Sequence, residues 1–326
     1  MADPLYPAIE PYRSEHLDVG DGHRLYVEQA GDPEGIAVLC IHGGPGGAST
    51  PRQRRFFDPG RYRIVSFDQR GCGRSLPAGE RRANDTAASL CDIERIRLHL
   101  GIERWLVFGG SWGAALAVLY AGAHAQPCLG LILRGAFLAG PADLDWFFHG
   151  AAALAPDAWA ALDARIARDH GESLMAACLR QARGADEALA GRVVAAWLAW
   201  EAALSRPWLP PPVAAAGVSA ATLAAYRLQA DYLERCFDLH EGQVLAAADQ
   251  ARGLPCALIH GRFDWVCRPA GAWALWRSLP GARLRLVEQA GHDSYPPAMA
   301  KALREAADAY PRNGGFDELG SEWLRS

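Results

Sequence analysis

The sequence lacks the signatures of several large classes of protein. It has no Cys-x-x-Cys pair among its eight cysteines, no His-Glu-x-x-His motif and no glycine pattern for phosphates or dinucleotides. We therefore expect neither a metal nor a cofactor. No apolar run is long enough to cross a bilayer, and no basic segment followed by an apolar stretch stands at the start. A cytoplasmic location, with mostly reduced cysteines, is the default expectation.

Excess charge is also missing. The formal net charge is −4 and no long basic run occurs. Neither nucleic acid nor an anionic membrane is therefore an expected partner. The composition itself is that of a globular protein, with half of its 326 residues apolar and about a fifth charged. This length suits one α/β domain with an insertion.

Short apolar runs alternate with helical patterns in two parts of the chain. Such alternation predicts a mostly parallel, doubly wound sheet. We expect a hairpin over 17–30, strands at 36–42, 62–68, 105–108, 129–133, 256–260 and 284–287, and helices at 89–100 and 296–310. The polar, glycine-containing residues 311–326 are expected to form a loose tail.

The middle of the chain has a different pattern. From about 141 to 245 it is rich in Ala, Leu and Trp at helical spacing, and prolines interrupt it at 207–212. We expect a helical cap over 141–245, inserted into a core domain that comprises 1–140 and 246–326.

The clearest functional motif follows the apolar run at 105–108. The residues at 109–113 read Gly-Gly-Ser-Trp-Gly, and a helical pattern of small residues comes next. Gly-x-Ser-x-Gly between a strand and a helix is typical of the nucleophile elbow of α/β-hydrolases, where a strained turn exposes the serine hydroxyl. An ordinary glycine-rich turn is the alternative. The motif predicts the α/β-hydrolase fold with Ser111 as nucleophile.

A serine nucleophile needs a base that an acidic group orients. In this fold the acid and then the histidine follow the serine along the chain. Asp264 and His292 stand at the ends of the last two expected strands, where these groups belong. Asp264 could instead cap a helix. Asp293 is a rival acid, poorly placed because it adjoins the histidine, and His260 is a rival base that is more easily explained as structural.

Two backbone N–H groups are expected to bind the oxyanion. Trp112, directly after the nucleophile, supplies one. Gly43 or Gly44, in the glycine loop at 42–47 that follows an expected strand, supplies the other. A plain glycine turn is the alternative for this loop.

Several segments together resemble the proline iminopeptidases, also called prolyl aminopeptidases. The most specific are the Gly-Gly-Ser-Trp-Gly elbow and the stretch Asp-Gln-Arg-Gly-x-Gly-x-Ser at 68–75, in combination. The others lie at 42–47, 133–137, 197–201, 260–264 and 291–292. The resemblance extends from about residue 6 to residue 310.

The resemblance implies removal of N-terminal proline from small peptides. Ser111 would form a prolyl ester, with His292 moving protons and Asp264 holding the imidazole. No metal or cofactor would take part. The resemblance also implies that Glu201 reads the protonated imino group and that Arg134 orients this acid.

The resemblance places Phe137, Phe147 and Cys267 around the proline ring. It also exposes departures. Gln229 stands where the family typically carries a second cap acid, with Asp231 and Glu234 nearby, and Phe147 and Leu233 replace a tyrosine and a phenylalanine.

The departures leave a second function open. An esterase or amidase with a remodelled cap is the alternative to the peptidase. A non-catalytic binding protein is disfavoured because the catalytic residues are all present. Epoxide hydrolases and dehalogenases are disfavoured because they carry aspartate where this chain has Ser111.

Overall fold

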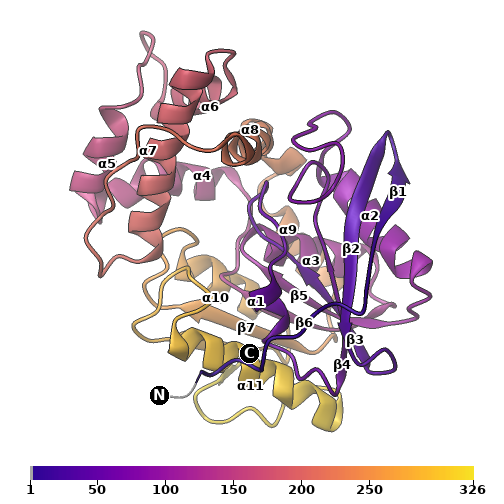
Figure 1. Cartoon of the computed structure of the whole chain (residues 1–326). Helices are drawn as coiled ribbons and strands as arrows, with labels where there is room; N and C mark the ends of the chain where they lie inside the picture. Colours follow the sequence, from indigo (N-terminus) through magenta and orange to yellow (C-terminus); the bar gives the residue numbers. More distant parts are fainter. Residues whose placement is uncertain (1–2) are drawn as a thin grey trace.

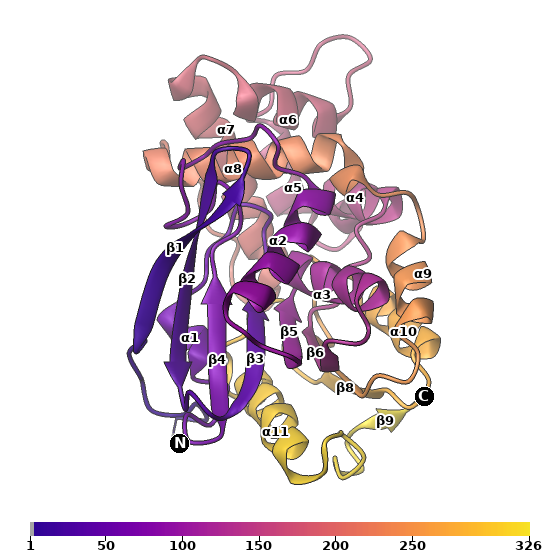
Figure 2. The same cartoon turned by 90° about the vertical axis from the view of Figure 1, so that its right-hand side faces the viewer.

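The computed structural model describes residues 3–326, which contain one nine-stranded sheet (Figures 1 and 2). The strand order is β1-β2-β4-β3-β5-β6-β7-β8-β9. The strands are β1 (Arg13–Gly20), β2 (His23–Gly31), β3 (Ile36–Ile41), β4 (Tyr62–Phe67), β5 (Trp105–Gly110), β6 (Cys128–Arg134), β7 (Cys256–Gly261), β8 (Arg283–Val287) and β9 (Leu324–Arg325). The run from β4 to β8 is parallel, whereas β1, β2 and β9 pair antiparallel. The predicted hairpin and parallel strands are therefore present.

Helices cover both faces of the sheet. The central strands β5 and β7 are buried along their whole length, which explains why their sequences are continuous apolar runs. One hydrophobic core packs the sheet against α2 (Thr86–His99), α3 (Trp112–Ala123), α9 (Gln243–Gln250) and α10 (Pro269–Ser278). A second core packs the opposite face against α11 (Pro297–Asn313). The short helix α1 (Pro51–Arg54) precedes β4.

The remaining helices form a layer beside the carboxyl ends of the parallel strands, toward which β3, β4 and β5 point in Figure 2. They are α4 (Pro141–Phe148), the 3-10 turn η1 (Gly150–Ala153), α5 (Pro156–Asp163), α6 (Leu174–Arg183), α7 (Glu187–Ser205), α8 (Ala220–Glu234) and the 3-10 turn η2 (Cys236–Asp238). Ser173, Asp186 and Ser219 cap the first turns of α6, α7 and α8. We call this layer the cap.

Helix α9 crosses the predicted cap boundary at residue 245. It lies against α3, where a Cβ on Gly122 would be only 2.7 Å from the carbonyl oxygen of Ala247. The division into 1–140, 141–245 and 246–326 stays a prediction, and residues 1 and 2 of its first segment lie outside the described residues.

The end of the chain is not a loose tail, so that prediction is wrong. Helix α11 extends to Asn313, and β9 then pairs with β8 through Leu284 and Leu324. Phe316 and Trp323 are buried against the second core. Polar and glycine residues suggested a mobile segment, but the apolar side chains spaced between them bury enough surface to hold it down.

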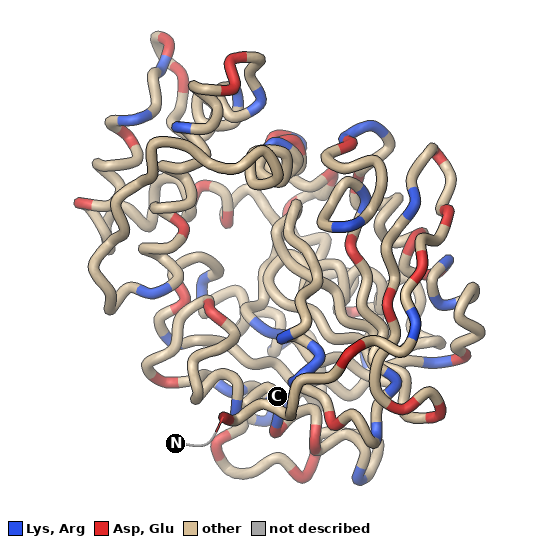
Figure 3. The backbone as a smooth tube through the Cα atoms, in the orientation of Figure 1, with Lys and Arg blue, Asp and Glu red and all other residues tan. Residues whose placement is uncertain are grey.

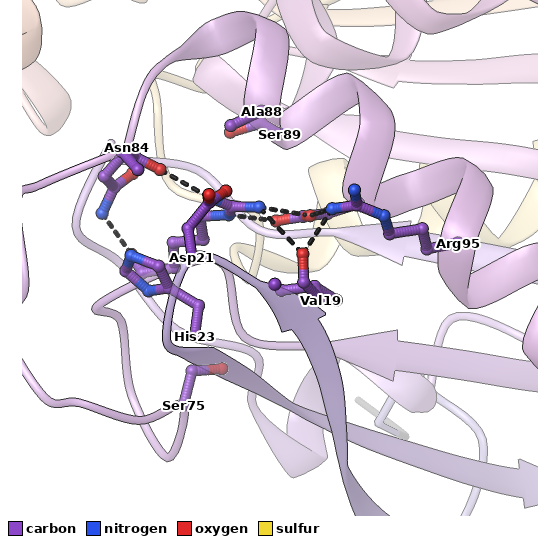
Figure 4. A network of polar contacts seen from close by, with 12 residues as sticks. Val19, Asp21, His23, Ser75, Asn84, Ala88, Ser89 and Arg95 are labelled. Carbon is purple, nitrogen blue, oxygen red and sulfur yellow. Dashed lines mark hydrogen bonds and ion pairs between the residues drawn. The ribbon is translucent and has the colours of Figure 1, made fainter.

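Buried Arg70, from the loop after β4, ties the β1–β2 hairpin to α2. Its guanidinium donates to Asp92 at 2.6 and 2.9 Å and to Asp21 at 3.0 Å. Figure 4 shows this network from close by, with Arg95 also reaching the carbonyl of Val19. Arg70 thereby anchors this loop to the hairpin and to α2, and the preceding residue, Gln69, reaches Trp112.

Acidic and basic residues are interspersed over the sheet domain and the cap (Figure 3). Within residues 3–326, none of the helices has the length and apolar character needed to cross a membrane.

Candidate active site

Ser111 lies at the sharp turn between β5 and α3. Its backbone has φ 58° and ψ −124°, a conformation that non-glycine residues rarely adopt. A Cβ on Gly109 would be 2.1 Å from the carbonyl oxygen of Gly113, and one on Gly113 would be 2.3 Å from that of Ile41. The glycines are therefore required by close backbone contacts, and the strained turn has the geometry of a nucleophile elbow.

The structure brings Asp264 and His292 together, although 28 residues separate them. His292 Nδ1 donates to Asp264 Oδ2 at 2.7 Å, and Asp264 Oδ1 accepts from the N–H of Cys267 at 2.8 Å. Burial raises the pKa of Asp264, but His292, His260 and the N–H of Cys267 together outweigh it, so this pKa lies below its usual value. Asp264 is thus held ionised, and the imidazole keeps Nε2 available as a base.

The rival residues have other contacts. Asp293 accepts from the N–H of Tyr295 at 3.0 Å rather than from the imidazole. His260 is fully buried between the N–H of Ala136, at 3.1 Å, and the carbonyl of Cys267, at 2.8 Å. Both therefore have structural explanations.

Arg134 lies against His292 and not against Glu201. Its Nη1 donates to the carbonyl of His292 at 2.8 Å and lies 3.4 Å from both ring nitrogens. The expected contact between Arg134 and the cap acid is not formed. The end of β6 points this side chain toward the catalytic loops of the core.

Ser111 Oγ contacts the thiol of Cys267 at 3.8 Å. Among residues 3–326 no hydrogen bond joins this oxygen to the His292 imidazole. Nucleophile–base hydrogen bonds are often long until substrate binds and draws the groups together. Burial raises the pKa of Cys267 well above its usual value, so the neighbouring thiol is neutral.

The backbone of the glycine loop packs directly on the elbow. A Cβ on Gly43 would be 2.9 Å from the carbonyl oxygen of Gly110 and 3.3 Å from Ser111 Cβ. Gly44 has φ +123° and lines the same cavity as Ser111. Trp112 begins α3, where N–H groups have no partner within the helix and the helix dipole is positive. This arrangement supports the predicted oxyanion hole.

Gln69, which we did not predict as a functional residue, connects the glycine loop at 42–47 to the nucleophile elbow. Its side-chain nitrogen donates to the carbonyl of His42 at 2.8 Å, and its oxygen accepts from Trp112 Nε1 at 3.1 Å. The backbone N–H of Gln69 donates to His42 Nε2 at 2.9 Å, so His42 Nδ1 donates to the carbonyl of Gly43, 2.8 Å away. Burial lowers the pKa of His42, which keeps the ring neutral.

The sequence did contain a signal for Gln69. This residue follows β4 closely, just as His42 follows β3, and these two strands are parallel neighbours. Residues at the carboxyl ends of adjacent parallel strands meet at one edge of the sheet. Gln69 of the motif at 68–75 therefore links the glycine loop at 42–47 to Trp112.

A cavity between the core and the cap has Ser111 in its wall. Five of the six residues predicted to bind substrate also line it: Phe137, Phe147, Glu201, Gln229 and Cys267. The sixth, Arg134, does not. Phe237, which the sequence did not single out, also lines it, stacked 5.1 Å from Trp112 at the kinked 3-10 turn η2.

Two carboxylates face this cavity, and they differ in their partners. Asp143 forms an ion pair with Arg268 at 2.8 Å. Glu201 instead accepts a hydrogen bond at 2.9 Å from the neutral hydroxyl of Tyr226. In the described part of the chain, no Lys or Arg lies within ion-pair distance of Glu201. Burial raises its pKa, and Tyr226 and then His292 partly counter this. A cation would complete the site.

Known proteins share this architecture. Residues 36–297 match the family model of the alpha/beta hydrolase fold. A proline iminopeptidase of Xylella fastidiosa is 40% identical over 309 residues, which are 94% of this chain and 99% of that protein. One of Arabidopsis thaliana is 41% identical over 304 residues, 92% of this chain and 80% of that protein. The solved proline iminopeptidase-related protein of Thermus thermophilus has a TM-score of 0.56 at 25% identity, covering 93% of this chain and 98% of its own.

Proposed function

The chain belongs to the proline iminopeptidase family of the α/β-hydrolases, and we propose that it is a serine exopeptidase that releases N-terminal proline from small peptides. The family membership and the fold class are those that the motifs predict. One observation carries the substrate assignment: Glu201, a half-buried carboxylate without a cationic partner in the described chain, faces the same cavity as Ser111.

The catalytic residues act in a fixed order. Ser111 attacks the proline carbonyl while His292 takes the hydroxyl proton, and Asp264 stabilises the imidazolium that forms. The N–H of Trp112 and that of Gly43 or Gly44 bind the oxyanion. His292 then protonates the leaving amine, and water hydrolyses the prolyl ester by the same steps in reverse.

Exopeptidase action requires recognition of the free N-terminus. A protonated imino group in a dry cavity needs a carboxylate, which Glu201 provides, and the side-chain oxygen of Gln229 can accept its second N–H. Phe137, Phe147 and Cys267 give the ring apolar walls. An internal proline has no ionised nitrogen and would leave Glu201 buried and unpaired, which is costly.

The test compares L-prolyl-4-nitroanilide with cyclopentanecarbonyl-4-nitroanilide. The two have the same leaving group and ring size and differ in the ring nitrogen. We expect kcat/KM to favour the prolyl compound at least about 100-fold, since a buried charge-assisted contact is at stake. Alanyl-4-nitroanilide and 4-nitrophenyl acetate are run beside them.

Equal hydrolysis of the two anilides, or faster turnover of the ester with no release of proline, would reject the peptidase. That result would favour the esterase or amidase that Gln229 leaves open.

The cytoplasmic location is also a proposal. Its support is that the eight cysteines, all within residues 3–326, are free thiols. Small peptides with N-terminal proline are the proposed partners.

A further inference from the structure

Tyr226 is a buried polar residue next to the catalytic cavity that the mechanism above does not use. It lies on α8, and 9% of it is exposed. Its hydroxyl donates to Glu201 Oε2 at 2.9 Å. Its ring packs edge-on against Trp197 of α7, with centroids 5.1 Å apart and planes at 83°. The ring is therefore held from one side while the hydroxyl reaches the acid.

The helices place the two residues opposite each other. Trp197 and Glu201 are four residues apart on α7 and share one face of it, as Tyr226 and Gln229 do on α8 at a spacing of three. Helix α8 thus brings the Tyr226 hydroxyl to Glu201 and places Gln229 in the wall of the same cavity as this acid. The edge-on packing of the Tyr226 ring on Trp197 supports this placement of the hydroxyl.

The charges in the cavity explain why a neutral donor suits this position. N-terminal proline brings one positive charge. Arg268 already neutralises Asp143, so Glu201 alone is left to balance the substrate. A cationic partner for Glu201 would cancel the attraction of this carboxylate for the substrate. A second unpaired carboxylate beside it would have to lose its hydration, which costs free energy. A hydroxyl fixes the carboxylate without altering its charge.

We propose that Tyr226 is a positioning residue for proline recognition: it holds Glu201 Oε2 so that Oε1 meets the ring nitrogen of the substrate. The inference depends on the proposed function, because it assumes that the substrate carries an ammonium. Gln229 completes the site from the next turn of α8. Specificity for N-terminal proline is thus set by a tyrosine–glutamate pair that spans two cap helices.

The pair also has a consequence for pH. Tyr226 and His292 are the groups that act on the carboxylate of Glu201. Gln229 from α8, Cys267 after β7 and Asp143, which is paired with Arg268, line the same cavity. Only Tyr226 hydrogen-bonds the carboxylate among them. Without its hydroxyl the anion is less stabilised, and proline preference is lost at a higher pH than in the wild type.

The experiment measures the ratio of kcat/KM for prolyl to cyclopentanecarbonyl 4-nitroanilide. Tyr226→Phe keeps the ring on Trp197 and removes the hydroxyl. We expect the ratio to fall about 10-fold, mainly through KM of the prolyl compound, as for a hydrogen bond to a charged group. We also expect the acid limb of this ratio to move to higher pH.

Tyr232→Phe is the matched control. Tyr232 is also buried on α8, but its hydroxyl donates to Asn84 at 2.9 Å and not to Glu201. The ratio for Tyr232→Phe should stay within about twofold of the wild type, since the contacts that are lost, to Asn84 and Ser89, lie outside the cavity.

A double-mutant cycle with Glu201→Gln separates positioning from general packing. If Tyr226 acts through Glu201, adding Tyr226→Phe to Glu201→Gln changes the ratio by less than about twofold. The proposal is overturned if the two losses multiply, or if Tyr226→Phe slows both anilides equally. A wild-type enzyme that does not distinguish the anilides would reject the proposed function itself, which is a different result.

Discussion

The two walls of the catalytic cavity are built differently. On the core side, backbone geometry fixes the reactive groups: Ser111 lies in a strained turn between glycines, and Asp264 accepts from backbone N–H groups. On the cap side, Glu201 and Gln229 project from helices, and one hydrogen bond from Tyr226 orients the acid. Reaction chemistry and recognition of the charged N-terminus therefore depend on separate parts of the chain, and substitutions should affect one without the other.

The largest effect is expected on the core side, from Ser111→Ala. Without the nucleophile, kcat should fall at least about 10⁴-fold for both anilides, because the triad acts as a unit. The fold should be kept, as checked by circular dichroism and thermal unfolding. Turnover that persists above this level would assign the chemistry to another residue.

Asp264 and its rival Asp293 give a paired test of the core wall. Asp264→Asn should cost about 10⁴-fold in kcat, since the imidazole would lose its orienting partner. Asp293→Asn, one residue from His292, should change kcat less than about threefold. A large loss from Asp293→Asn with little effect of Asp264→Asn would assign the orientation of His292 to Asp293 instead.

The next effect is expected on the cap side, from Glu201→Gln. The prolyl-to-cyclopentanecarbonyl ratio of kcat/KM should fall about 100-fold, because a charged partner of the substrate is removed from a dry site. The compound without the ring nitrogen should lose far less. Equal losses on the two anilides would show that Glu201 does not recognise the substrate's charge. The core and cap walls would then not differ in the way described.

A smaller effect is expected from Gln69→Leu, which removes the link between the glycine loop and Trp112. Looser oxyanion donors should lower kcat about 10-fold for both anilides, while KM and the ratio change little. A change confined to the prolyl compound would place Gln69 on the recognition side.

The smallest effect is a pH dependence of the wild-type ratio. Burial raises the pKa of Glu201 above its usual value, and Tyr226 only partly offsets this. As the pH falls through this raised pKa, the carboxylate becomes neutral and stops attracting the cationic substrate. The ratio should therefore drop several-fold at acid pH.

This ratio has an internal control. Both substrates are hydrolysed by the same catalytic residues, so the pH dependence of the shared chemistry cancels when the two values of kcat/KM are divided. A ratio that stays constant from neutral to acid pH would show that Glu201 does not titrate in recognition.

Much of the core could be predicted because its signals are local. Short apolar runs predicted β3 to β8, and the elbow motif predicted Ser111. The order of strands along the chain gave Asp264 and His292, since the fold brings strand ends to one edge. The pocket residues Phe137, Phe147, Glu201, Gln229 and Cys267 came from the family resemblance, and the cavity contains all five.

The sequence by itself thus determined the parallel sheet, the helical character of the cap and the catalytic motifs, because periodicity and turn chemistry act over a few residues. The tertiary structure decided which distant side chains meet. It placed Arg134 on His292, 158 residues away, joined Gln69 to Trp112 and Tyr226 to Glu201, and packed the final residues onto the core. These contacts depend on how helices and strands pack. Packing results from many weak interactions between segments that are distant in the sequence, and a local sequence pattern does not contain them.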